Sequence, residues 1–134
     1  MNTQAFLPMN KQSPPHSKGA RFIMLGMGED GHTASLFPHT EGLKIEDRLV
    51  IANFIPQRQV WRMTFTYSCI NQALNTVIYV LGSAKQHMLA EVLLSPHDPD
   101  RYPIQAVGTT ARHALWIADE AAATELIAKK EQKK

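Results

Sequence analysis

The chain has 134 residues, about one domain's worth, and 44% of them are hydrophobic and 19% charged, as in an ordinary folded protein. This balance excludes disordered, collagen-like and disulfide-stapled proteins. The formal net charge is only +2, and four of the basic residues are lysines within the last six positions. The remainder is close to neutral, so we expect no nucleic-acid partner, which would require several clustered phosphate contacts.

Signals for membranes and export are weak. No apolar run approaches the roughly 18 residues that span a bilayer, and the apolar residues 5–7 are followed at once by Pro8. The one cysteine, Cys69, cannot form an internal disulfide, which fits a reducing compartment. We therefore expect a soluble, cytoplasmic protein that has no membrane partner.

Residues 1–19 contain three prolines and few apolar side chains, which is typical of a tail or linker, and the expected domain spans residues 20–134. Short apolar or alternating runs predict strands at residues 22–25, 49–54, 63–67, 76–81 and 114–118. Helices are expected at residues 68–74, from residue 83 to about 95, and from residue 119 to about 130. This alternation predicts an α/β fold with a largely parallel sheet flanked by helices.

The second of these helices carries two local signals. Ser83 with Gln86 three residues later predicts a capping box at its start. Its apolar residues recur at helical spacing, which predicts one buried face made of Met88, Leu89, Val92 and Leu93.

The segment at residues 26–38, GMGEDGHTASLFP, is the most informative part of the sequence. Its glycines match the G-x-G-x-x-G pattern of dinucleotide sites. However, Glu29 and Asp30 place two carboxylates where a pyrophosphate would lie, and Pro38 ends any following helix within two turns. We therefore expect no dinucleotide cofactor.

The same loop offers acid–base chemistry. Asp30 lies two residues before His32, at the end of a predicted strand, where open α/β sheets bind their ligands. A carboxylate beside an imidazole fixes its tautomer, and histidine is the side chain best suited to act as a general base near neutral pH. The alternative is that Asp30 only caps a short helix and His32 is an ordinary loop residue.

The segment at residues 26–38 resembles the signature of the 6-phosphogluconolactonases, in the superfamily that includes the glucosamine-6-phosphate isomerases. Similar segments follow in the family's order, with RMTFT at residues 62–66, GSAK at 82–85 and a final stretch at 116–122. The resemblance covers about residues 20–130 and implies the C-terminal half of the phosphosugar isomerase/lactonase fold.

The resemblance also implies roles for individual residues. His32 corresponds to the catalytic base and Asp30 to its partner acid. The implied substrate-binding residues are Gly28, Gly31, Arg62 and Lys85. No metal ligand and no cofactor is implied, and the expected partner is a phosphorylated sugar lactone.

The local sequence also offers an interpretation of two of these residues that does not depend on the resemblance. Lys85 lies near a predicted helix start, where a cation is unfavourable unless an anion binds there. A solvated surface lysine is the alternative. Arg62 follows Trp61 directly and could instead stack on its indole.

One position separates the two chemistries of the superfamily. The isomerases carry a glutamate five residues after the histidine, and here that position is Phe37, whose ring cannot relay a proton. The implied function is therefore hydrolysis of 6-phospho-D-glucono-1,5-lactone to 6-phosphogluconate, a step of the oxidative pentose phosphate pathway. The isomerase/deaminase reaction is less favoured.

Family members are longer, and begin with a half that supplies a Gly/Ser-rich phosphate loop not found in residues 1–19. The chain is then a truncated product, a half that pairs with another chain, or an inactive remnant. The alternative function is a non-catalytic half-domain that binds a sugar phosphate or a partner. A sheet without its first strands is expected to expose an edge and an apolar face. Such a chain is expected to self-associate or to bind a complementary N-terminal half.

Overall fold

A computed structural model describes residues 20–134, and the expected tail at residues 1–19 lies outside the described residues. The strands are β1 (Phe22–Gly26), β2 (Val50–Ile55), β3 (Val60–Phe65), β4 (Asn75–Val80) and β5 (Leu115–Ala118). The α-helices are α2 (Tyr67–Ile70), α3 (Gln86–Leu94) and α4 (Glu120–Gln132), and the 3₁₀ turns are η2 (Glu41–Lys44), η3 (Ser83–Lys85) and η4 (Pro103–Ala106). Within residues 20–134 no helix is long and apolar enough to cross a membrane.

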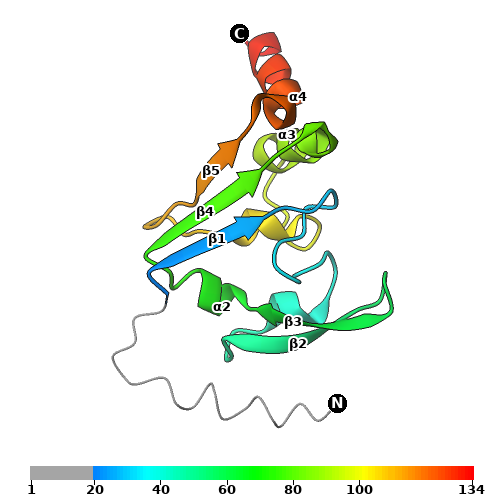
Figure 1. Ribbon diagram of the computed structural model, residues 1–134, viewed down its shortest axis with the longest axis vertical. Coiled ribbons are helices and arrows are strands. Elements are labelled where there is room, and N and C mark those ends of the chain that lie inside the picture. Colours follow the sequence, from blue (N-terminus) through cyan, green and yellow to red (C-terminus); the bar gives the residue numbers. More distant parts are fainter. Residues whose placement is uncertain (1–19) are drawn as a thin grey trace.

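Three strands form a parallel sheet in the order β1-β4-β5 (Figure 1). Leu25 lies opposite Ile78, which lies opposite Trp116. Since all three strands run in the same direction, their carboxyl ends meet at one edge of the sheet. The predicted α/β fold with a parallel sheet is confirmed.

The other two strands depart from the expected alternation of strands and helices. β2 and β3 form a separate antiparallel hairpin, with Asn53 opposite Arg62. Residues 56–59 connect them through a turn in which the Arg58 N–H donates to the Ile55 carbonyl at 3.1 Å. Such a connection is too short for the crossover that a parallel pair requires.

One face of the parallel sheet carries the core. Leu25, Ile78 and Val80 of the sheet pack with Leu89 and Val92 of α3 in a single buried cluster. Two details of the predicted helix are wrong. The side chain of Leu93 is 39% exposed, and no capping box forms, because Ser83 lies in η3 and α3 begins only at Gln86.

The opposite face of the sheet is uncovered among the described residues. Large apolar side chains are exposed there in every strand, at Phe22, Met24, Tyr79, Leu115 and Ile117. The strand register places Met24, Val77 and Leu115 in one row, in which Met24 is 64% and Leu115 60% exposed while Val77 between them is buried. β1 also pairs on one side only, with β4. The expected free edge and uncovered apolar face are therefore present in residues 20–134, and we call this face the bare face.

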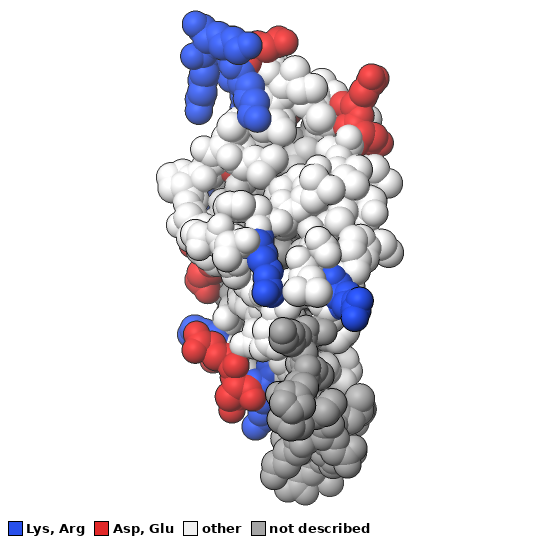
Figure 2. Space-filling view, turned by 90° about the vertical axis from the view of Figure 1, so that its left-hand side faces the viewer, with Lys and Arg blue, Asp and Glu red and all other residues white. Residues whose placement is uncertain are grey.

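Figure 2 views the molecule from the left-hand side of Figure 1. Charged side chains of both signs lie at the top of this view and again lower down, with a broad area free of them in between. Exposed apolar side chains gathered on one face, as on the bare face, mark an interaction site or an aggregation hazard.

The bare face predicts concentration-dependent self-association of the 134-residue chain. Replacing Met24 and Leu115 together by glutamate should abolish it, because an apolar contact cannot bury unpaired carboxylates without a large cost. The molar mass in solution, measured by light scattering over a range of concentrations, tests this. Leu93→Glu, at an exposed apolar position on α3, is the matched control and should associate like the wild type. A wild-type chain that stays monomeric throughout would contradict the prediction.

Candidate functional site

The segment that follows β1 lies at the carboxyl edge of the parallel sheet. It is built from tight turns, with the Gly31 N–H donating to the Gly28 carbonyl at 3.0 Å and the Gly28 N–H donating to the His32 carbonyl at 2.9 Å. The Thr33 hydroxyl ties the loop back to β1 through the Gly26 carbonyl, at 2.8 Å. No helix forms between this loop and η2. The alternative in which Asp30 caps a helix is therefore wrong, and the glycine pattern lacks the helix that a dinucleotide site requires.

The loop brings Asp30 and His32 into direct contact. Nδ1 of His32 meets Oδ1 of Asp30, and the backbone N–H of His32 donates to the same oxygen at 3.1 Å. Burial acts to raise the pKa of Asp30, but these hydrogen bonds outweigh it and hold that pKa below its ordinary value. Asp30 is therefore an anion at neutral pH, and the neutral imidazole places its proton on Nδ1 to donate to it. The lone pair of the histidine then lies on Nε2, the atom that a general base requires.

Two glycines make room for this pair. A Cβ at Gly28 would lie 2.1 Å from Cε1 and Nδ1 of His32 and 2.7 Å from Oδ1 of Asp30. Gly31 has a φ of 81°, and a Cβ there would lie 3.2 Å from the Tyr102 ring. Both glycines that the resemblance assigns to substrate binding thus also shape the loop around His32.

Asp30 contacts the edge of the imidazole, and an aromatic ring packs against its face. The ring of His32 stacks on the ring of Phe37, with 4.0 Å between centroids and 15° between planes. Phe37 is only 1% exposed. The guanidinium carbons of Arg58 and Arg62 lie 5.0 Å and 5.8 Å from the centroid of the same ring. Position 37, where an isomerase would carry its glutamate, is thus a packing platform beside His32.

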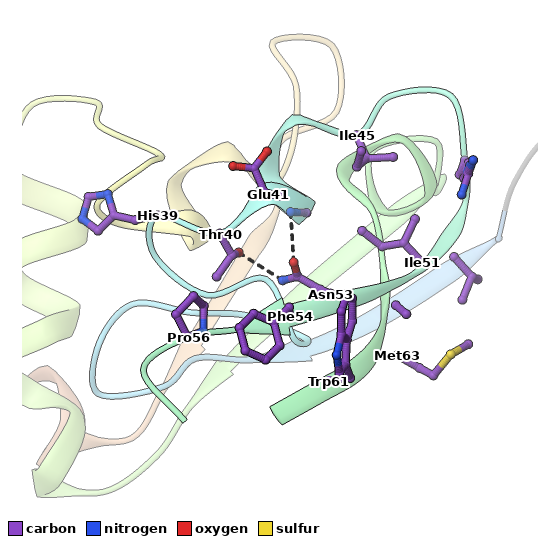
Figure 3. Close-up of a pocket in the computed structure, with 14 residues that line it drawn as sticks. His39, Thr40, Glu41, Ile45, Ile51, Asn53, Phe54, Pro56, Trp61 and Met63 are labelled. Atoms are coloured by element: carbon purple, nitrogen blue, oxygen red, sulfur yellow. Dashed lines mark hydrogen bonds between the residues drawn. The ribbon is translucent and has the colours of Figure 1, made fainter. Parts of the chain in front are cut away.

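The β2–β3 hairpin is tied to the loop and to the segment after it through Asn53, whose bond to Thr40 is drawn in Figure 3. The buried amide of Asn53 donates to the Ser35 carbonyl at 2.9 Å and to the Thr40 hydroxyl at 3.0 Å, and it accepts from the Gly42 N–H at 3.0 Å. Directly opposite residues of an antiparallel pair share one face. Arg62, which is opposite Asn53, therefore lies on the face that meets the loop.

Trp61 belongs to the other face of the hairpin. Its ring packs against Phe54, the cross-strand neighbour, at 5.2 Å between centroids. The alternative in which Arg62 stacks on Trp61 is therefore wrong, because consecutive residues of a strand point to opposite faces. Phe54 and Trp61 line a cavity of about 420 Å³ between the hairpin and η2, to which neither Asp30 nor His32 contributes.

Lys85 reaches the same edge of the sheet by another route. It ends η3, which follows β4, and its backbone N–H donates to the Gly82 carbonyl at 3.2 Å. One turn later, Sδ of Met88 lies 3.5 Å from where a Cβ of Gly31 would be, so the start of α3 adjoins the loop. Contact of Lys85 with an anion stays a prediction. Across residues 20–134, no group of three or more histidine, cysteine or carboxylate side chains could hold a metal ion.

Sequence reasoning missed three residues of this site. Asn53 had a signal, since it is a polar residue within the apolar run LVIANF and a buried amide needs partners. Phe37 was interpreted only as a missing glutamate, and its stacking on His32 depends on the fold. Arg58 lies in a turn and had no signal at all.

Comparison with known proteins identifies the family. Residues 6–116 match the family model described as glucosamine-6-phosphate isomerases/6-phosphogluconolactonase. The 6-phosphogluconolactonase of Chlamydia muridarum is 48% identical over 95 residues, which are 71% of this chain and 37% of that protein. The 6-phosphogluconolactonase of Synechocystis is 40% identical over 112 residues, which are 83% of this chain and 45% of that protein.

A solved structure shares the fold of this chain. The crystal structure of the devB protein superposes with a TM-score of 0.77 at 26% identity, over 94% of this chain and 56% of that one. The matched regions are 37% and 45% of the two curated relatives, so the chain spans less than half their length, and the predicted partial resemblance is confirmed. The chain belongs to the glucosamine-6-phosphate isomerase/6-phosphogluconolactonase family.

Proposed function

We propose that this chain carries the base and part of the phosphate site for hydrolysis of 6-phospho-D-glucono-1,5-lactone to 6-phosphogluconate, in the oxidative pentose phosphate pathway. The observation that carries the proposal is the contact between Asp30 and His32 at the carboxyl end of β1. It is supported by relatives named 6-phosphogluconolactonase that are 40–48% identical over the matched region.

In the proposed reaction, Nε2 of His32 accepts a proton from water as the water oxygen attacks the lactone carbonyl. The Asp30 carboxylate stabilises the imidazolium that forms. The imidazolium then gives its proton to the ring oxygen as the carbon–oxygen bond breaks. Backbone N–H groups of the glycine loop are the donors we assign to the developing oxyanion.

Phe37 favours hydrolysis over isomerisation. A phenyl ring cannot move a proton, and this ring is already engaged with the imidazole at 4.0 Å. The same ring is approached by two guanidinium groups, those of Arg58 and Arg62.

A second candidate function is a non-catalytic half-domain that binds a sugar phosphate or a partner chain. The bare face and the free edge of β1 favour it, together with the shortness of the chain relative to its relatives. We propose that a complementary N-terminal half completes the site, because positioning of the lactone accounts for a large part of such catalysis. The isolated chain should then hydrolyse lactone at little more than the spontaneous rate. The cytoplasmic location stays a prediction.

The base can be tested in an active assembly, formed by co-expressing this chain with the part of the Chlamydia muridarum relative that it does not match. His32→Ala should lower kcat by about 10²–10⁴, the usual effect of losing a general base. Acid release from freshly generated lactone, corrected for spontaneous hydrolysis, is the measurement. Phosphate binding should change little. A variant with near-normal turnover would exclude His32 as the base.

Gly28 provides a test with an internal control. Gly28→Ala should lower kcat nearly as far as His32→Ala, because the new methyl group would occupy the space of the imidazole. Gly26→Ala is the matched control, since a Cβ there meets nothing within 4 Å. Amide spectra of both variants should show an intact core. Equal activity of the two variants would show that Gly28 does not shape the dyad.

The phosphate site can be tested on the chain alone. Adding inorganic phosphate should shift the amide resonances of residues 82–86, where Lys85 lies near the start of α3. In the active assembly, Arg62→Ala and Lys85→Ala should each raise KM more than they lower kcat. Lys44→Ala, an exposed lysine paired with Glu41, is the control. Undisturbed resonances at residues 82–86 in high phosphate would exclude Lys85 from the site.

A further inference from the structure

Arg58 occupies an unusual position for an arginine in a hairpin turn. Its guanidinium carbon lies 5.0 Å from the centroid of the Phe37 ring, closer than that of Arg62 at 5.8 Å. Within residues 20–134 neither arginine forms an ion pair with a carboxylate. Two unpaired cations thus converge on the ring that stacks on His32.

Each cation gains from the ring, but the two repel one another. Attraction between a guanidinium and an aromatic face is modest at an exposed site, whereas two like charges beside one ring repel one another and an anion between them removes that repulsion. A guanidinium presents a planar fork of N–H donors that fits the oxygen atoms of a phosphate or carboxylate group. The two guanidinium groups are therefore the kind of side chains that bind an oxyanion, and both lie beside the Phe37 ring.

Two features of the fold place Arg58 and Arg62 beside the Phe37 ring. Asn53 fixes the hairpin face that carries Arg62 against the loop. Arg58 is held in the turn by its own backbone, whose N–H donates to the Ile55 carbonyl at 3.1 Å. The two guanidinium groups thus reach Phe37 from different parts of the hairpin, one from β3 and one from the turn before it.

We propose that Arg58 is a second oxyanion-binding residue, which acts with Arg62 on the phosphate group of the substrate beside Phe37. This inference rests on the proposed function and adds to it a residue that the resemblance does not assign. It adds a contact from the hairpin turn to the phosphate contacts proposed for Arg62 and Lys85, beside the ring on which His32 stacks. Arg58 touches substrate in this account, and Phe37 positions both groups.

Binding measured by NMR on the complete 134-residue chain tests the proposal without any turnover. Inorganic phosphate is the probe, and gluconate, which has a carboxylate and no phosphate, is the second arm. Arg58→Gln should raise the Kd for phosphate about tenfold, the usual effect of losing a charge-assisted contact. Arg58→Lys should restore part of the affinity, because it keeps the charge and loses the fork. Gluconate should bind weakly to every variant.

Arg112→Gln is the matched control, because Arg112 is an exposed arginine whose Nη1 donates to the Gln72 carbonyl, before the start of β4 and away from the carboxyl edge. It should bind phosphate like the wild type. An Arg58→Gln variant that binds phosphate as Arg112→Gln does would overturn the inference, as would a selective loss of gluconate binding. His32→Ala should keep the phosphate affinity of the chain while lowering kcat in the active assembly, so the proposed base and the proposed role of Arg58 are tested separately.

Discussion

The imidazole of His32 is fixed on its edge and on its face, and the rest of the site depends on this constraint. The Asp30 carboxylate accepts at the edge, and the Phe37 ring packs against the face. Gly28 leaves the space in which the two side chains of the dyad meet. An imidazole held in one orientation needs no reorganisation before it accepts a proton, which is the main advantage of a preformed group.

Topology places the supporting groups around this imidazole. Parallel pairing of β1 with β4 brings the glycine loop and the start of α3 to one edge of the sheet, and the β2–β3 hairpin closes on the loop through Asn53. The groups around His32 are therefore held by hydrogen bonds and packing. The exposed apolar side chains lie elsewhere, on the bare face, and β1 has a free edge. Residues 20–134 thus combine a preformed contact between Asp30 and His32 with an uncovered sheet face.

Much of this structure was predictable from local patterns. Continuous apolar runs located all three strands of the parallel sheet, and the spacing of Asp30 and His32 on a glycine loop located the dyad. The β2–β3 pairing was missed because a strand pattern does not tell whether its partner is parallel or antiparallel. The start of α3 was misplaced because the residues at 83–85 form a 3₁₀ turn despite a capping sequence. Phe37 and Arg58 could not be assigned, since their roles arise from contacts between segments distant in sequence.

If Asp30 fixes the tautomer of His32, the neutral ring carries its proton on Nδ1 and keeps Nε2 unprotonated. The ¹⁵N chemical shifts of the His32 ring, measured in the 134-residue chain with the ring neutral, distinguish the two tautomers. We expect a proton on Nδ1 and an unprotonated Nε2, and Asp30→Asn should disturb this preference. A ring protonated on Nε2, or a tautomer that does not respond to Asp30→Asn, would show that Asp30 does not fix the imidazole.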